Sequence, residues 1–336
     1  MKTIAAVFAL GLAVVLGAGR AGESQTRKAF VVRNDSEGPR AMAEGGLVDL
    51  VRRHGYDITG VDTVKLTPAE DKEYGEWNRD ALESRQIGRL VAARRLNEGP
   101  VIGLLTNCVD LLGMLSGLQH LGPPAAAGAP SGADERNLHR DGLAGLKPLR
   151  VGLVYLDAHA DFNTPETTLS GMLGGMDVAI AAGLCLTRLR LKTGLDPALP
   201  TKYIVMGGLR DVDPLEQELL DRSDVEFLSV DDLRRTSEEI GRQMDRLGRL
   251  TDVIYVHIDM DVLDPSEVRG HSLSVPEGPT SLELAAAVER MFHHPKAGAI
   301  GIASLPFGER DKDGISLKAA YLLIEAALKG HKSSRP

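Results

Sequence analysis

Residues 149–161, which read LRVGLVYLDAHAD, decide the fold. The run 149–156 is almost entirely apolar, which is typical of a strand covered on both faces. Similar short apolar runs recur along the chain and alternate with longer amphipathic stretches. Because this alternation is typical of parallel sheets covered by helices, the sequence predicts an α/β fold with a mostly parallel sheet. Ligands in such sheets bind beyond the carboxyl ends of the strands.

The other elements follow from the same pattern. The predicted strands are residues 29–32, 101–105, 149–156, 203–206, 225–228, 253–258 and 299–303. The predicted helices are residues 38–54, 73–97, 110–120, 213–221, 236–247, 281–293 and 316–329.

Composition excludes several classes of protein. The chain has 336 residues, of which 43% are hydrophobic and 26% charged, as expected for a folded protein with a substantial core. Its net charge is −8 and only 4% of its residues are aromatic, so nucleic acid is not an expected partner. Two cysteines, Cys108 and Cys185, exclude a disulfide-rich scaffold.

The N-terminal segment has the layout of a secretory signal peptide. Lys2 precedes the apolar run 4–16, and small residues Gly19 and Ala21 suit cleavage after residue 21. We therefore expect an exported protein, periplasmic or secreted, with no membrane attachment after cleavage. A single membrane anchor is the alternative, although the run is short for one.

The rest of the chain shows one alternation of strands and helices and no boundary. Residues 28–330 are therefore expected to form a single domain. Residues 121–149 are rich in Gly, Pro and Ala and are expected to be an inserted loop.

Acidic residues and a histidine follow two of the predicted strands. Asp157, His159 and Asp161 come directly after one strand, and Asp259 and Asp261 end another. In extended chain, residues two apart point to the same side, so each set would share a face. Carboxylates and imidazole together suit divalent first-row metals. The alternative is that each acid caps a helix or binds loop amides, which is common for an isolated D-x-D.

These motifs resemble those of the ureohydrolase (arginase–agmatinase) family. DAHADFNTPETTLSG resembles its D-A-H-x-D-x-N motif, HIDMDVLDPS its S-x-D-x-D-x-x-D-P motif, and GGLRDVDPLE its G-x-R-D-x-D segment. The resemblance covers nearly all of the chain after the N-terminal segment. It implies a three-layer α/β/α fold, a binuclear Mn²⁺ centre and hydrolysis of a guanidino or amidino group to urea and an amine. It also implies a homo-oligomer, a trimer or a hexamer.

The resemblance assigns roles to individual residues. It implies that Asp157, His159, Asp161, Asp259 and Asp261 bind metal, with Asp157 and Asp259 bridging two ions. It also implies that a substrate with an amino-acid head is held by the residues Asn163, Ser170, Asp213 and Glu216. For Asn163 and Ser170, ordinary turn chemistry remains an alternative.

Three positions depart from the family pattern. Cys108 stands where the family has its first histidine ligand, and a thiolate favours Zn²⁺ or Fe²⁺ over Mn²⁺. The alternative for Cys108 is a small buried apolar residue. The proton-carrying histidine of the family falls at Gly174, and the glutamate that binds the guanidinium falls near Ala303 or Ser304.

The sequence therefore predicts a metal-dependent hydrolase of a C–N bond in a linear amidine, with an altered active site. We hypothesise that His271 replaces the missing proton carrier and that Asp161 or Asp264 orients the attacking water. His257 is a further candidate behind the metal ligands. Two alternatives remain: an impaired metal- or ligand-binding protein of the same fold, and a metallohydrolase of another amide or imine.

Overall fold

The computed structural model describes residues 27–58, 60–122 and 147–334. The predicted signal peptide, residues 1–21, lies outside the described residues. Residues 123–146, which belong to the predicted insertion, also lie outside them. No helix in the described part of the chain is both long and apolar enough to cross a bilayer.

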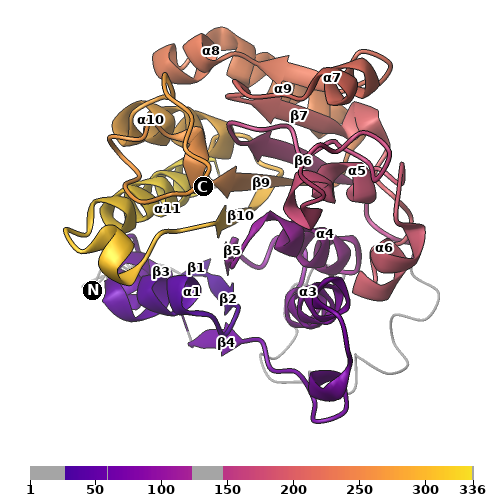
Figure 1. Cartoon of the computed structure of the whole chain (residues 1–336). Coiled ribbons are helices and arrows are strands. Elements are labelled where there is room, and N and C mark those ends of the chain that lie inside the picture. The colour runs from indigo at the N-terminus through magenta and orange to yellow at the C-terminus, as the bar shows by residue number, and fades with distance from the viewer. Residues whose placement is uncertain (1–26, 59, 123–146, 335–336) are drawn as a thin grey trace, which may run out of the picture.

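One parallel sheet forms the middle of the described structure (Figure 1). Its eight described strands follow the order β4-β2-β5-β10-β9-β6-β7-β8, and every neighbouring pair runs parallel. The strands are β2 (Phe30–Arg33), β4 (Val61–Thr63), β5 (Val101–Leu104), β6 (Val151–Leu156), β7 (Ile204–Gly207), β8 (Glu226–Leu228), β9 (Val253–Asp259) and β10 (Ala297–Ala303). A separate short pair joins β1 (Arg27–Lys28) to β3 (Tyr56–Asp57).

Helices cover both faces of the sheet, which confirms the predicted three-layer α/β/α architecture (Figure 1). One face carries α1 (Glu37–Met42), α2 (Val48–Arg53), α8 (Val230–Arg235), α9 (Glu238–Leu250), α10 (Ser281–Phe292) and α11 (Ile315–Ser333). The other carries α3 (Glu76–Ala92), α4 (Leu111–Gln119), α5 (Asp177–Ala181), α6 (Thr187–Thr193) and α7 (Pro214–Leu220).

The alternation of side chains along each strand separates the two cores. In β6, Leu153 and Tyr155 belong to the cluster on the α3–α7 side, whereas Val154 and Leu156 belong to the cluster on the α10–α11 side. Both faces of the strand are therefore buried, as the continuous apolar run predicted.

Some elements differ from the sequence expectation. The predicted helix 38–54 is interrupted at η1 (Ala43–Leu47), where Gly46 has φ 114° and so leaves the helical conformation. Strands β1, β3 and β4 and helices α5, α6 and α8 were not predicted, because each is short and carries little periodic signal.

Close packing of α4 against α3 fixes the segment that follows Cys108. A Cβ added at Gly113 of α4 would lie 2.2 Å from the backbone oxygen of Ser84 and 2.9 Å from Cβ of Ile87. Only a glycine therefore allows the two helices to approach this closely.

Gly113→Ala is expected to lower the free energy of unfolding by about 1–3 kcal/mol, because the new methyl group overpacks the interface. Urea unfolding of the two proteins measures the difference. The control is Gly174→Ala, where the added Cβ has no neighbour within 4 Å, so its change should stay within about 0.5 kcal/mol. Equal stability of Gly113→Ala and wild type would contradict the packing argument.

Candidate metal centre and active site

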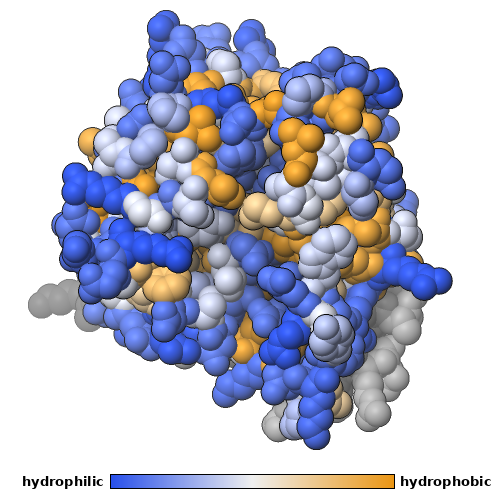
Figure 2. All heavy atoms as spheres, viewed as in Figure 1, coloured by the Kyte–Doolittle hydropathy of each residue, from blue (hydrophilic) through white to orange (hydrophobic). Residues whose placement is uncertain are grey.

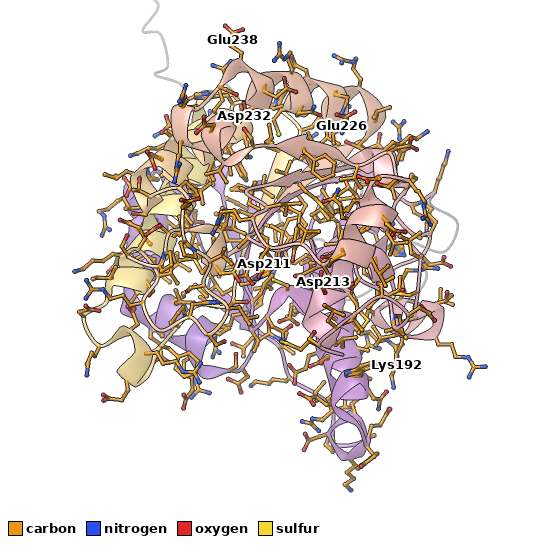
Figure 3. The ribbon with its side chains drawn as sticks, turned by 45° about the horizontal axis from the view of Figure 1, so that its top comes forward. Lys192, Asp211, Asp213, Glu226, Asp232 and Glu238 are labelled. Atoms are coloured by element: carbon orange, nitrogen blue, oxygen red, sulfur yellow. The ribbon has the colours of Figure 1, made fainter. Side chains whose placement is uncertain are left out.

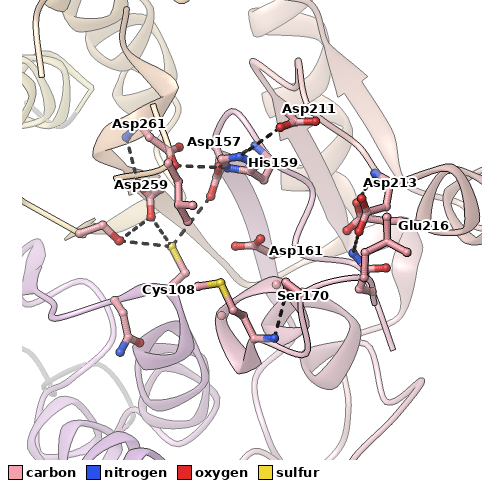
Figure 4. A pocket seen from close by; sticks show the side chains of 18 residues that line it. Cys108, Asp157, His159, Asp161, Ser170, Asp211, Asp213, Glu216, Asp259 and Asp261 are labelled. Carbon is pink, nitrogen blue, oxygen red and sulfur yellow. Dashed lines mark hydrogen bonds and ion pairs between the residues drawn. The ribbon is translucent and has the colours of Figure 1, made fainter. Parts of the chain in front are cut away.

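A pocket lies at the carboxyl ends of the central strands, where ligands bind in parallel α/β sheets (Figure 4). Its lining includes all six predicted metal ligands. They are Cys108, Asp157, His159, Asp161, Asp259 and Asp261.

The segment after β6 turns directly beyond the strand. The backbone N–H of His159 donates to Asp157 Oδ1 at 2.7 Å, which forms a local turn. Asp161 has φ 46°, so the extended geometry expected from 157 to 161 does not persist. Asp161 nevertheless faces the pocket, and Tyr155 in β6 donates its O–H to Asp161 Oδ2 at 2.5 Å. A turn therefore brings Asp161 to the site.

The segment after β9 repeats this arrangement. Asp259 ends the strand, and its Oδ1 accepts the backbone N–H of Asp261 at 2.9 Å. His159 Nδ1 lies 3.3 Å from Asp157 Oδ1 and 3.2 Å from Asp261 Oδ2. One ligand atom from each of these three residues lies within 4.8 Å of the others, which suits a shared cation.

Cys108 lies beside the carboxylates. Its Sγ is 2.7 Å from Asp259 Oδ2 and 3.9 Å from Asp157 Oδ2 (Figure 4). The side chain is buried and also packs in the hydrophobic cluster on the α3–α7 side of the sheet. Cys108 is therefore part of the candidate metal centre.

The electrostatics of the cluster favour a cation. Burial raises the pKa of Asp259 and of Asp261 to about 6, and mutual repulsion of the carboxylates adds to both shifts. Burial also raises the pKa of the Cys108 thiol, and the charge of Asp259 reinforces it. For His159, burial opposes the charged form, but hydrogen bonds and charge from Asp157 and Asp261 prevail and raise the pKa to about 11. A divalent ion would relieve the repulsion that these shifts report.

His271 lies beside the carboxylate cluster, and His257 lies behind it. His271 lies with Nε2 3.5 Å from Asp259 Oδ1, and its Nδ1 accepts the backbone N–H of Leu273 at 3.3 Å. His257 is fully buried, with Nδ1 2.8 Å from the Tyr255 hydroxyl and Nε2 3.4 Å from Cys108 Sγ. Burial lowers the pKa of His257 to about 3, so this imidazole is neutral.

The structure does not bring Asp264 to the pocket. Its carboxylate accepts hydrogen bonds from Ser266 and from the backbone N–H of Glu277 in a turn. Residues lining the pocket do not include it.

The predicted substrate-binding residues lie together on another wall of the pocket. Asp213 Oδ2 accepts a hydrogen bond from Asn163 Nδ2 at 3.1 Å, and Ser170 also lines the pocket. Glu216 has a structural task, because its carboxylate accepts the backbone N–H groups of Phe162 at 2.7 Å and Asp213 at 3.1 Å. Asp211 and Asp213 lie toward the middle of the view in Figure 3, whereas Lys192 and Glu238 lie toward its edges.

Sequence reasoning gave no role to Ser304 or Asp177, which lie beside the candidate ligands. Ser304, where a glutamate was expected, donates its hydroxyl to Asp259 Oδ2 at 2.5 Å. Asp177 is a buried carboxylate whose oxygen, with ligand atoms of Cys108 and Asp161, forms a further group within 4.8 Å. Asp177 belongs to no ligand motif, and its polar character in an otherwise apolar helical turn was the signal available.

Comparison with known proteins identifies the family. The model of the arginase family matches residues 139–307, a range that carries every candidate ligand except Cys108. This chain belongs to the arginase family.

Relatives and solved structures within the arginase family agree on the fold. The arginase of Neurospora crassa is 31% identical over 238 residues, which is 68% of this chain and 61% of that arginase. An N(omega)-hydroxy-L-arginine amidinohydrolase of Streptomyces lavendulae is 32% identical over 151 residues, which is 45% of this chain and 49% of that protein. The solved native structure of Bacillus caldovelox arginase superposes with a TM-score of 0.72 at 20% identity, covering 90% of this chain and 98% of that one.

The buried neutral imidazole makes stability depend on pH. In metal-free protein, the unfolded chain binds a proton at His257 below about pH 6.5, whereas the folded protein does so only near pH 3. Stability from this group is therefore present above pH 6.5 and lost as the pH falls toward 3.

The free energy of unfolding of His257→Asn is expected to fall less steeply than that of wild type as the pH is lowered. Between pH 6 and 4 its slope should be shallower by up to about 1.4 kcal/mol per pH unit, because the variant lacks the one proton that the unfolded wild type takes up at His257. Urea unfolding in the presence of a chelator, at several pH values, measures both slopes. Parallel curves for the variant and wild type would contradict a buried neutral His257.

Proposed function

We propose that this protein is a metal-dependent hydrolase of a C–N bond in a guanidino or amidino compound, with an arginine-like amino acid as substrate. The observation that carries the proposal is the convergence of Asp157, His159, Asp259 and Asp261 at one pocket. Membership of the arginase family supports the same reaction class.

The donors fit a divalent cation. Asp157, His159 and Asp261 would hold Mn²⁺ through oxygen and nitrogen, with Asp259 between this site and Cys108. A thiolate at Cys108 would favour a softer ion such as Zn²⁺ or Fe²⁺ at the other site. Bound there, such ions supply Lewis acidity and make water a stronger nucleophile.

The side chains of the pocket account for substrate binding. The carboxylate of Asp213 would bind a substrate amino group, and the amide of Asn163 and hydroxyl of Ser170 would bind a carboxylate. Leu169, Met172 and Leu273 add an apolar part to the lining. Hydrophobic patches interrupt the hydrophilic surface on the face seen in Figure 2.

The side chain of Ser304 affects which substrates the pocket would bind. A hydroxyl at residue 304, already bonded to Asp259, binds a guanidinium less strongly than a carboxylate does. This favours a substrate whose guanidino group carries a further substituent, because binding such a group depends less on a carboxylate that pairs with its positive charge. The similarity to a hydroxyarginine amidinohydrolase supports a hydroxylated arginine as one such substrate.

We also propose that the protein is exported after removal of residues 1–21, that residues 28–330 are one domain, and that it assembles as a homo-oligomer. The first two proposals rest on the layout of the N-terminal segment and on the single strand–helix alternation. The third rests on family resemblance.

Metal-loaded protein is expected to release urea or a substituted urea from arginine or hydroxyarginine, but not from agmatine, which lacks the carboxylate that Asn163 and Ser170 would bind. His159→Asn should lower kcat/KM at least about 100-fold, because it removes a metal ligand. Colorimetric urea assays and metal analysis of both proteins measure this. No product from any guanidino or amidino compound, with metal bound, would contradict the proposed reaction and leave the two alternatives, a binding protein or a hydrolase of another amide or imine.

His271 is proposed to give a proton to the leaving amine. His271→Ala should lower kcat by about 10²–10⁴ with unchanged metal content, because general acid catalysis is lost. The control is His293→Ala, which changes an exposed histidine at the end of α10. Full turnover by His271→Ala would contradict the role, and loss of bound metal would make His271 a ligand instead.

A further inference from the structure

Asp177 is a buried carboxylate without a hydrogen-bond partner. Its residue is 0% exposed, and neither Oδ1 nor Oδ2 has a partner in hydrogen-bonding geometry among the described residues. The adjacent backbone N–H of Val178 donates instead to the backbone oxygen of Asp161 at 3.1 Å. A buried polar group without a hydrogen-bond partner destabilises a fold, because it has lost its contacts with water and gained none from the protein. A cation is the partner that would remove this destabilisation.

The carboxylate faces two other donors of the site. One oxygen of Asp177, one oxygen of Asp161 and Sγ of Cys108 all lie within 4.8 Å of one another. In a tetrahedral zinc site, metal–sulfur and metal–oxygen bonds of about 2.3 and 2.1 Å separate the ligand atoms by about 3.6 Å. The three side chains are therefore spaced so that small movements would close them around one ion.

One contact of Cys108 would support a metal-bound thiolate. His257 Nε2 lies 3.4 Å from Sγ, and its Nδ1 lies 2.8 Å from the Tyr255 hydroxyl. If the tyrosine O–H donates to Nδ1, then Nε2 carries the proton and donates to sulfur. Hydrogen bonds of this kind orient metal ligands and tune them.

We propose that Asp177 is an additional metal ligand, which forms the first metal site together with Cys108 and Asp161. This inference rests on the metal centre of the proposed function and adds a residue outside both ligand motifs. The site joins one thiolate to carboxylates, and this donor set takes a Zn²⁺-like ion. The carboxylate of Asp177 adds a ligand to those of Cys108 and Asp161.

Metal binding by the full mature chain tests the inference. Chelated protein is reloaded with Zn²⁺ or Co²⁺, and the bound metal is counted by mass spectrometry and its affinity measured by titration calorimetry. Wild type should bind two ions, and its cobalt form should show sulfur-to-cobalt charge-transfer absorption. Asp177→Asn should bind the ion at Cys108 at least about tenfold more weakly, and its sulfur-to-cobalt absorption should be weaker. It should keep the ion at His159.

Stability gives a second readout that a structural role would not produce. Without metal, Asp177→Asn should melt close to wild type, because the amide has the shape of the carboxyl group and is likewise a buried polar group. With metal, its gain in melting temperature should be smaller than that of wild type. The matched control is Asp110→Asn, a buried carboxylate that accepts the Thr106 N–H at 3.0 Å and lies outside every ligand group. It should keep both ions.

Other results would contradict the role of Asp177, the metal site at Cys108 or the proposed function. If Asp177→Asn binds two ions as tightly as wild type, Asp177 is not a ligand and the proposed function stands. If wild type binds one ion without sulfur-to-cobalt absorption, the first site does not exist. If wild type binds no metal, the proposed function itself fails. Should Asp177→Asn not fold, X-ray absorption of zinc-loaded wild type decides: a shell without sulfur overturns the site.

Discussion

The active site depends on the pairing of β6 with β9. Leu156 lies opposite Ile258 in parallel register, so the residues that follow, Asp157 and Asp259, lie beside each other at the carboxyl ends of the two strands. On the other side of β9, Ala303 lies opposite Asp259, which places Ser304 next to the same carboxylate. Backbone hydrogen bonds between buried strands thus force like charges together. The energy that holds the sheet opposes the repulsion of the carboxylates, and a cation would remove the conflict.

Much of this arrangement could be predicted from the sequence, because it follows from strand ends. The apolar runs before Asp157 and before Asp259 indicated buried parallel strands, and parallel strands align their carboxyl ends. The order of the strands was not readable in this way, since β6, β9 and β10 are far apart in sequence but adjacent in the sheet. Family resemblance supplied what local patterns could not.

The parts that escaped prediction depend on tertiary contacts. Asp161 reaches the site through a left-handed backbone conformation that no two-residue periodicity encodes. Asp177 starts a five-residue helix, too short to show a hydrophobic pattern, and its position next to Cys108 arises only when α5 packs near α4. Asp264 illustrates the converse, because a residue inside a ligand motif is used by a local turn.

Gly174 and Gly113 differ in what the fold permits at each position. A Cβ placed at Gly174 would meet no atom within 4 Å, so the pocket leaves room for a side chain at this residue. At Gly113 the backbone of α3 fills that room. The lining of the pocket can therefore be changed at residue 174 at little steric cost, whereas the helix pair beneath the site tolerates no such change.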